Sequence, residues 1–274
     1  MEDVSEELFT KERNQHMFVT TAGRVTDTMI NKARSVAEDL DIPYIPRRKK
    51  SISQLQNERG GGCIVAGNES IRLFAFGEEE PFFFHPSSAM FRVKRLLGGG
   101  YDPMIEAADL RKGDSFLDCT LGLASDSIVA SMVVGNIGNV TGIEANKFLG
   151  YIVKNGLHSW HSGVGELDAA MERIDVVHSV ALEYLQSLPD ESVDCVYFDP
   201  MFDIGIDESE GIKALRHFAL HGGIGGEEIK EALRVARKRV VLKDHYLSKR
   251  FEDFGFTVMR RKTAKFHFGY IEKN

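Results

Sequence analysis

The chain has 274 residues, 43% of them hydrophobic, and carries a formal net charge of -7 at pH 7. That length allows a sizeable hydrophobic core and more than one compact unit. No apolar run reaches about eighteen residues and the N-terminus is acidic and polar, so we expect neither a membrane span nor a secretory signal. We expect a cytoplasmic protein without a membrane partner.

The first 85 residues predict a small α/β unit. Apolar residues recur every three or four positions over residues 26–40, which is typical of a helix with one buried face, and Pro43 ends the pattern. Short apolar runs predict strands at residues 17–21, 63–66, 71–76 and 81–84. A connector with a basic cluster at residues 92–95 and a run of glycines at residues 98–100 follows, so we place the first domain at residues 1–100.

From Tyr101 onward, strand and helix patterns alternate. Strands are expected at residues 115–118, 140–144, 174–178, 193–198 and 239–243, and helices at 103–108, 146–157, 181–187 and 227–237. Two final strands, 257–260 and 266–271, are expected to close the sheet as an antiparallel pair. This alternation is typical of α/β folds, so we predict a Rossmann-like, mostly parallel doubly wound sheet in a second domain at residues 101–274.

Two of these strands end in carboxylates. The strand 115–118 ends at Asp118, a turn containing Gly122 follows, and the next strand ends at Glu144. In dinucleotide folds a glycine turn admits the ligand and an acid on the next strand accepts ribose hydroxyls. The G-x-G-x-x-G spacing that suits a pyrophosphate is missing, which favours a nucleoside with a smaller zwitterionic group.

S-adenosylmethionine (SAM) is a nucleoside of this kind. We expect Asp118 to face its ammonium group, Gly122 to let the chain pass close beneath it, and Glu144 to accept both ribose hydroxyls. The alternative is that Asp118 only caps the turn or the helix that begins near Ser125 or Asp126, and that Glu144 is a solvated strand end. The combination at this spacing favours a SAM site.

A third strand, 193–198, is followed by Asp199, Pro200 and Phe202. Ligands of open α/β sheets bind at the C-terminal ends of the strands. A carboxylate, a backbone carbonyl and a flat ring at that place suit an exocyclic amine on an aromatic base. The alternative is an ordinary turn or helix start with proline at its first position.

The chemistry of such an amine explains these groups. Its nitrogen is a poor nucleophile because the lone pair is delocalised into the ring. If Asp199 and the Pro200 carbonyl accept its two N–H bonds, the nitrogen can pyramidalise toward the sulfonium methyl. We expect Phe202 to stack on a base that is unpaired or flipped out. The mechanism requires no metal.

Other residues offer competing chemistry. Cys119 and Cys195 could attack a pyrimidine carbon, but a thiol inside an apolar strand has a raised pKa and little access, so we predict core residues. His158 and His161 have i, i+3 spacing without an evident third ligand, which favours surface histidines over a metal site. For Lys243, at the end of an apolar strand, a substrate contact and a simple strand end both stay open.

Basic residues gather at residues 47–50, 92–95 and 237–265 despite the negative net charge. They predict phosphate contacts if the fold collects them on one face, and otherwise a solvated surface. Residues 203–210 are acidic instead.

Several blocks together resemble the RsmJ-type class I SAM-dependent methyltransferases, which act on a guanine N2 in bacterial small-subunit ribosomal RNA. The likeness covers roughly residues 82–271 and rests on residues 98–100 (GGG), 117–126 (LDCTLGLASD), Glu144, 196–202 (VYFDPMF) and 238–243 (KRVVLK). The Asp-Pro-Met-aromatic order is fairly specific, because many amino-methyltransferases have proline where Met201 stands.

The resemblance implies a class I methyltransferase fold, SAM as cofactor with S-adenosylhomocysteine as product, and small-subunit ribosomal RNA as partner. By position, it implies cofactor contacts at Ser125, Asp126, Glu144, Ala145, Val180, Ala181 and Asp199. Ser125 replaces an arginine that is frequent in the family. Ser179 and Val180 supply no carboxylate for the adenine amine. We therefore expect backbone groups to form the hydrogen bonds to this amine.

The predicted function is therefore SAM-dependent methylation of a guanine N2 in ribosomal RNA. Two alternatives stay open. The family is basic where residues 203–210 are acidic here, which favours a methyltransferase of a small molecule or a protein. The other alternative is a catalytically silent RNA-binding homologue.

Overall fold

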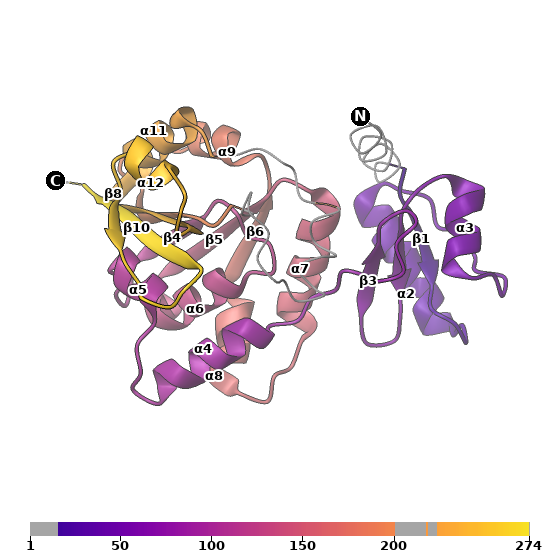
Figure 1. Ribbon diagram of the computed structural model, residues 1–274. Helices are drawn as coiled ribbons and strands as arrows, with labels where there is room; N and C mark the ends of the chain where they lie inside the picture. The colour runs from indigo at the N-terminus through magenta and orange to yellow at the C-terminus, as the bar shows by residue number, and fades with distance from the viewer. Residues whose placement is uncertain (1–15, 201–217, 219–223, 274) are drawn as a thin grey trace. The chain divides into compact units, whose positions relative to one another are not determined.

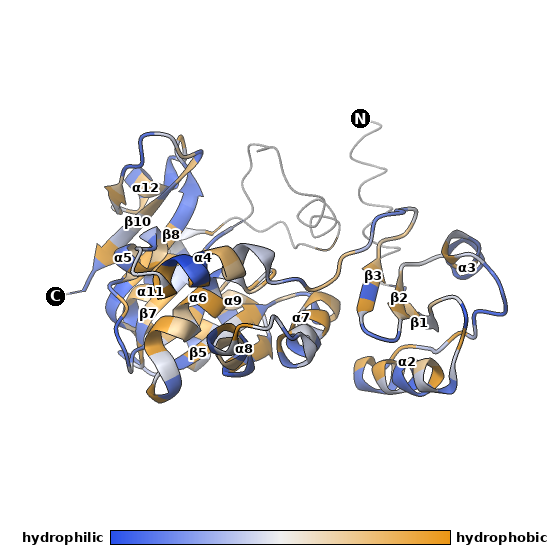
Figure 2. Ribbon diagram, turned by 90° about the horizontal axis from the view of Figure 1, so that it is seen from below, coloured by the Kyte–Doolittle hydropathy of each residue, from blue (hydrophilic) through white to orange (hydrophobic). Residues whose placement is uncertain are grey.

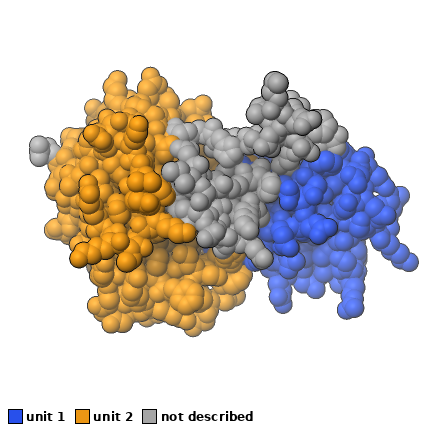
Figure 3. Space-filling view, viewed as in Figure 1, with its two compact units in different colours: residues 1–84, 147–152, 208–219 blue, residues 85–146, 153–207, 220–274 orange. Residues whose placement is uncertain are grey.

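The computed structural model describes residues 16–200, 218 and 224–273. These residues divide into two compact units, coloured separately in Figure 3. The smaller unit is built mainly of residues 16–84, together with residues 147–152. The larger unit contains residues 85–146, 153–200 and 224–273. The domain boundary at residue 100 stays a prediction, and the helix that follows the smaller unit groups with the larger one.

The smaller unit is a three-stranded sheet with two helices. Its strands, β1 (Phe18–Thr21), β2 (Cys63–Ala66) and β3 (Ile71–Phe74), lie in that order, with β1 parallel to β2 and β3 antiparallel to it. Helix α2 (Asp27–Leu40) carries hydrophobic and hydrophilic residues along its length (Figure 2). Its buried residues are spaced three or four apart, as the sequence predicted: Met29, Ala33, Val36, Ala37 and Leu40.

Two details of this unit differ from the sequence prediction. The strand expected at residues 81–84 is wrong, because only Phe82 pairs with β3, through an isolated bridge to Leu73. Helix α3 (Ile52–Arg59) was not predicted. It begins at a capping box in which Ser51 and Gln54 exchange side-chain to backbone hydrogen bonds, and this local signal is present in the sequence.

The larger unit is a seven-stranded sheet in the order β6-β5-β4-β7-β8-β10-β9 (Figure 1). Strands β6, β5, β4, β7 and β8 run parallel, and β10 and β9 are antiparallel, which confirms the predicted doubly wound, mostly parallel sheet with an antiparallel closing pair. The bounds are β4 (Ser115–Asp118), β5 (Asn139–Glu144), β6 (Ile174–His178), β7 (Val193–Phe198), β8 (Ala236–His245), β9 (Thr257–Met259) and β10 (Phe266–Glu272).

Helices cover both faces of this sheet (Figure 1). One face carries α6 (Ser125–Val134), with α4 (Ser87–Leu97), α5 (Pro103–Ala108) and α8 (Gly165–Glu172) packed against it. The other carries α9 (Ala181–Ser187), α11 (Gly226–Val235) and α12 (Arg250–Asp253). Helix α7 (Lys147–Ser159) and the short η1 (Gly135–Ile137) complete the described elements. The sequence did not predict α4 or α8.

The strand order creates a switch point at the centre of the sheet. From β4 the chain moves outward through β5 to β6, and then returns to the opposite side of β4 as β7. The connections that leave β4 and β7 therefore diverge, and in open α/β sheets such a place holds the ligand. Asp118, Glu144 and Asp199 all lie at this edge, because they end or directly follow β4, β5 and β7.

Gly138, which directly precedes β5, is closely packed, and this leads to a first prediction. A Cβ atom on Gly138 would lie 2.6 Å from the carbonyl oxygen of Asp114 and 2.5 Å from Cβ of Val134. We expect Gly138→Ala to lower the free energy of unfolding by about 1–3 kcal/mol, since backbone must move to admit the methyl group. Gly165→Ala is the matched control, because a Cβ there meets nothing within 4 Å. Urea unfolding of both variants checks this, and equal midpoints would contradict it.

Candidate functional site

Asp118 is buried at the end of β4 and closes the turn that follows it. Its carboxylate accepts hydrogen bonds from the Thr120 backbone N–H at 3.0 Å and from the Ser127 hydroxyl at 2.6 Å. Burial, together with the nearby Asp126 carboxylate, raises the pKa of Asp118 to about 7. Asp118 thus caps the turn, and its carboxyl group keeps its proton to a higher pH than an ordinary aspartate does.

The glycine turn after β4 has a backbone that few residues adopt. Gly122 has φ +49° and Ala124 has φ +59°, both in the left-handed region. Leu121 is buried in the turn and lies against Gly142 of β5. A Cβ atom added to Gly142 would lie 2.3 Å from Cδ1 of Leu121. Helix α6 then begins at Ser125 without a side-chain cap from Ala124. The first N–H groups of α6 thus lack the usual cap, and this is favourable for an anionic group.

Glu144 joins this turn from the neighbouring strand. Its carboxylate accepts a hydrogen bond from the Asn146 backbone at 2.9 Å and is also hydrogen-bonded to the Gly122 backbone. Burial raises its pKa. Glu144, which is partly exposed, therefore lies beside the glycine turn and is held by its backbone.

The loop after β6 completes this side of the site. The Ser179 N–H donates to the Glu144 carbonyl at 3.2 Å, which places Val180 and Ala181 next to the end of β5. Val180 precedes α9 as its N-cap residue, and Ala181 begins the helix. The Ala145 carbonyl lies 3.1 Å from Nε2 of His178. The fold thus brings together the positions for which the resemblance implies cofactor contacts.

Asp199 connects β7 to the turn after β4. Its backbone N–H donates to Oγ1 of Thr120 at 2.6 Å, and its carboxylate Oδ2 forms an ion pair with Lys243 of β8. Within the described part of the chain, its Oδ1 has no hydrogen-bond partner. Pro200, the next residue, is buried. Phe202, which we expected to stack on a base, lies outside the described residues, as does the acidic segment 203–210.

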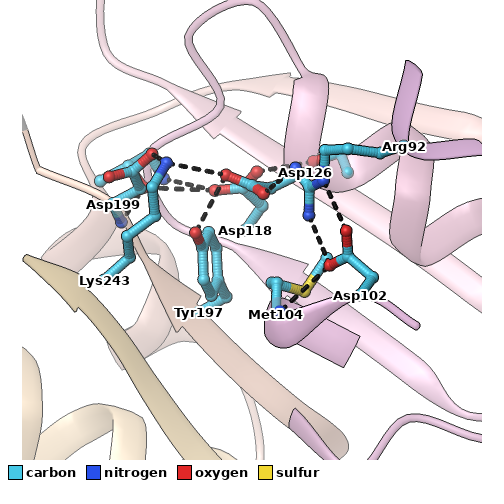
Figure 4. A network of polar contacts seen from close by, with 10 residues as sticks. Arg92, Asp102, Met104, Asp118, Asp126, Tyr197, Asp199 and Lys243 are labelled. Carbon is cyan, nitrogen blue, oxygen red and sulfur yellow. Dashed lines mark hydrogen bonds and ion pairs between the residues drawn. The ribbon is translucent and has the colours of Figure 1, made fainter. Parts of the chain in front are cut away.

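Asp126 is the centre of a buried polar network (Figure 4). Its Oδ2 accepts hydrogen bonds from the Tyr197 hydroxyl at 2.9 Å and lies 3.5 Å from Nζ of Lys243, and its Oδ1 pairs with Arg92. Arg92 also binds Asp102 through two parallel bonds of 2.8 Å. A continuous chain of charges therefore leads from α4 to the ion pair at Asp199.

The two cations set the charge of these carboxylates. Although burial alone would raise the pKa of Asp126, Lys243 and Arg92 hold it well below its usual range. Burial and the Asp126 carboxylate raise the pKa of Asp199 to about 6, against the opposing effect of Lys243. Both carboxylates raise the pKa of Lys243, so it stays charged. The site therefore contains one firmly ionised acid, Asp126, and two acids with raised pKa values, Asp118 and Asp199.

The sequence reasoning missed Arg92, Asp102 and Tyr197. Arg92 was visible only as part of a basic cluster, and its partners lie 10 and 34 positions away in the chain. The structure shows that Arg92 is engaged by carboxylates, so it is not a phosphate contact. The three glycines after it end α4, because Gly98, Gly99 and Gly100 donate to carbonyls of its last turn. Lys243, left open before, is a partner of two site carboxylates.

The competing chemistry finds no support in the described residues. Cys119 and Cys195 are buried thiols whose pKa values are raised by burial, as expected for core residues. Among the described residues, no group of three or more His, Cys, Asp or Glu side chains is arranged to hold a metal ion. None of the described helices combines the length and the apolarity that a membrane crossing requires.

Comparison with known proteins gives concordant results. A family model described as "Putative SAM-dependent methyltransferase" matches residues 52–268. An uncharacterized protein, YpiP, of Bacillus subtilis (strain 168) is 49% identical over 93% of this chain and 98% of its own length. A ribosomal RNA small subunit methyltransferase J of Shewanella sediminis (strain HAW-EB3) is 31% identical over 57% of this chain and 61% of its own.

A solved structure shows the same architecture. A SAM-dependent methyltransferase from Neisseria gonorrhoeae superposes with a TM-score of 0.62 at 20% sequence identity, covering 93% of this chain and 95% of that one. At this identity the likeness concerns the fold. The Rossmann-like class I methyltransferase fold expected from the sequence is thereby confirmed.

Proposed function

Because this chain belongs to the family of SAM-dependent methyltransferases, we propose that it methylates an exocyclic amine, guanine N2, of ribosomal RNA. SAM is the cofactor and supplies an electrophilic methyl group on a sulfonium. The observation that carries the proposal is one hydroxyl, Oγ1 of Thr120, which joins the turn at Asp118 to Asp199 through a 2.6 Å hydrogen bond. The cofactor turn and the acceptor for the amine are thus held at a fixed spacing.

The residues of the β4 and β5 ends suit SAM. We assign Asp118 to the ammonium group, the uncapped start of α6 at Ser125 to the carboxylate, and Glu144 to the ribose hydroxyls. In this assignment Gly122 lets the chain pass beneath the ligand, and the backbone at Ala145, Val180 and Ala181 contacts the adenine. Asp126, for which the resemblance implies a cofactor contact, also holds Tyr197 and Lys243.

On the substrate side, Asp199 has one oxygen for the amine. Its Oδ2 is held by Lys243, so Oδ1 and the Pro200 carbonyl accept the two N–H bonds. Lys243 fixes the carboxylate orientation and favours its ionised form against burial. The amine nitrogen then directs its lone pair at the methyl carbon, and the surplus proton leaves by way of Asp199 after the transfer. The remaining rate gain is positioning.

The experiment that tests this function uses ribosomal RNA from a strain lacking this gene, the purified protein and labelled SAM. We expect label in N2-methylguanosine after nucleoside analysis. Label in no RNA, together with demonstrable SAM binding, would instead support a methyltransferase of a small molecule or a protein. The sequence feature that favours this second function is the acidic stretch at residues 203–210.

Cofactor affinity is expected to depend on the ionisation of Asp118. Because its pKa is raised to about 7, the protonated carboxyl dominates below that pH and cannot pair with the ammonium group. SAM should therefore bind more tightly as the pH rises from about 5.5 to 7.5, and Asp118→Asn should remove most of this gain. Calorimetric titration of both proteins across that range measures it. A constant affinity ratio between parent and variant would show that Asp118 does not face the ammonium group.

A further inference from the structure

We propose that the turn between β9 and β10, together with Tyr246, binds the RNA strand that flanks the target nucleotide. This basic turn comprises residues 260–265, with Arg260, Arg261, Lys262 and Lys265. The proposal rests on the function proposed above and adds a substrate-binding surface to it. It identifies phosphates as the groups bound by the turn and a base as the group stacked on the ring.

The turn carries exposed positive charge that has no carboxylate partner among the described residues. In β8 and α12, most basic side chains already have carboxylate partners: Arg237 with Asp194, Lys238 with Asp114, Arg239 with Glu272, and Arg250 with Asp244. Arg260 and Lys262 are exposed, and neither forms an ion pair with any residue that the structure describes. The turn therefore offers positive charge to a polyanion, as does the exposed Lys249 that follows β8.

Sheet register places the turn at the edge that holds Asp199. Phe266 lies opposite His245, and Phe268 opposite Lys243, so β10 begins where β8 ends. The Tyr246 N–H donates to the Lys265 carbonyl at 3.2 Å, which fixes the loop after β8 against the turn. The acidic residues of α12, Glu252 and Asp253, precede the opposite end of β9.

Aromatic rings connect the turn to the ion pair. The Phe266 ring lies 5.0 Å from Nζ of Lys243 and 5.1 Å from Cζ of Arg261, measured to its centroid. Tyr246 is 49% exposed, and its ring is supported by His245 at 4.6 Å and His267 at 6.3 Å. Exposed rings beside cationic side chains are typical of surfaces that bind single-stranded RNA, because bases stack and phosphates pair. An acidic peptide would use the charges but not the ring.

The test compares Arg260→Ala/Lys262→Ala with Lys112→Ala/Lys230→Ala. The control removes the same charge from exposed residues elsewhere in the larger unit, with Lys112 before β4 at the opposite edge of the sheet. Binding of a fluorescein-labelled single-stranded RNA oligonucleotide is measured by anisotropy at several salt concentrations. We expect the first pair to raise Kd by about tenfold. In a plot of the logarithm of the association constant against the logarithm of the salt concentration, the steepness of the slope should decrease by about 1.4. Each phosphate contact with a single strand contributes about 0.7 to this steepness.

Tyr246→Ala separates stacking from charge. It should weaken binding of the same oligonucleotide by about tenfold with an unchanged salt slope. In methylation assays on ribosomal RNA, the turn variant and Tyr246→Ala should raise KM and leave kcat and SAM affinity unchanged.

Two outcomes would overturn the proposal. One is an equal Kd and salt slope for the turn variant and the control. The other is competition by polyglutamate as strong as that by RNA, together with no effect of Tyr246→Ala, which would indicate an acidic protein partner. A parent that methylates no RNA refutes the proposed function itself, and the binding measurements report on the turn independently of that result.

Discussion

Asp199→Asn is expected to lower kcat for methyl transfer by about 10²- to 10⁴-fold while weakening SAM binding only moderately. The substitution keeps the size of the side chain but removes the charge that accepts the amine N–H bond and pairs with Lys243. An amide has one acceptor oxygen where the carboxylate has two, so its NH2 group would face either the ammonium of Lys243 or the amine of the substrate, donor against donor. Single-turnover methylation of the substrate RNA measures the chemical step separately from product release.

The matched control is Asp175→Asn, which removes the same charge from an exposed residue of β6. It should leave the rate unchanged. In the parent protein, the rate is expected to rise as the pH passes through about 6, because Asp199 must be ionised and burial raises its pKa to that value. Equal rates for Asp199→Asn and the parent on the true substrate would refute the mechanism, whatever the pH profile.

Arg92→Met should destabilise the protein by about 3–5 kcal/mol. Arg92 is a partner of both Asp102 and Asp126, and its side chain is only 18% exposed. Without it, Asp102 would keep only Arg95 as an ion-pair partner and Asp126 only Lys243, in surroundings where an underpaired charge is expensive. The midpoint of urea unfolding, followed by the fluorescence of Trp160 and by circular dichroism, reports the loss.

Arg95→Met is its control, since the two arginines share Asp102. The Arg95 side chain is 51% exposed and contacts Asp102 at 3.0 Å, so its removal should cost less than about 1 kcal/mol. A similar shift in the two variants would mean that the network stabilises the protein no more than a surface ion pair does.

These predictions separate two roles within one network. In the proposed mechanism Asp199 acts on the substrate, whereas Arg92 of α4 joins Asp102, which caps α5, to Asp126 of α6 (Figure 4). Asp126 belongs to both, because it contacts Arg92 on one side and Lys243 on the other. Substitutions along this chain are therefore expected to be non-additive, as is usual for groups that share partners.

Much of the larger unit could be predicted from the sequence. Strands β4, β6 and β7 and helices α5 and α9 have the predicted bounds, and the other strands of the sheet differ by three residues or fewer at either end. In the sequence, parallel strands that are buried on both faces are continuous apolar runs followed by polar residues. The ends of such strands can therefore be recognised from the local sequence. In this kind of fold, ligands bind at the C-terminal ends of the strands. For that reason Asp118, Glu144 and Asp199 could be selected as site residues from the sequence.

Helix α4 and the ion-pair network were decided only by tertiary structure. The residues 92–95 show a basic cluster, but nothing local reveals that Arg92 turns inward to two carboxylates or that Tyr197 donates to Asp126 from 71 positions away. Lys243 pairs with Asp199 across 44 positions because β8 lies beside β7. Hydrophobic periodicity is a property of neighbours in the chain, whereas the partner of a buried charge is set by which strands and helices meet. The sequence by itself therefore determined the strands and the residues at their ends, and the fold determined which of these residues are paired, ionised and held in place.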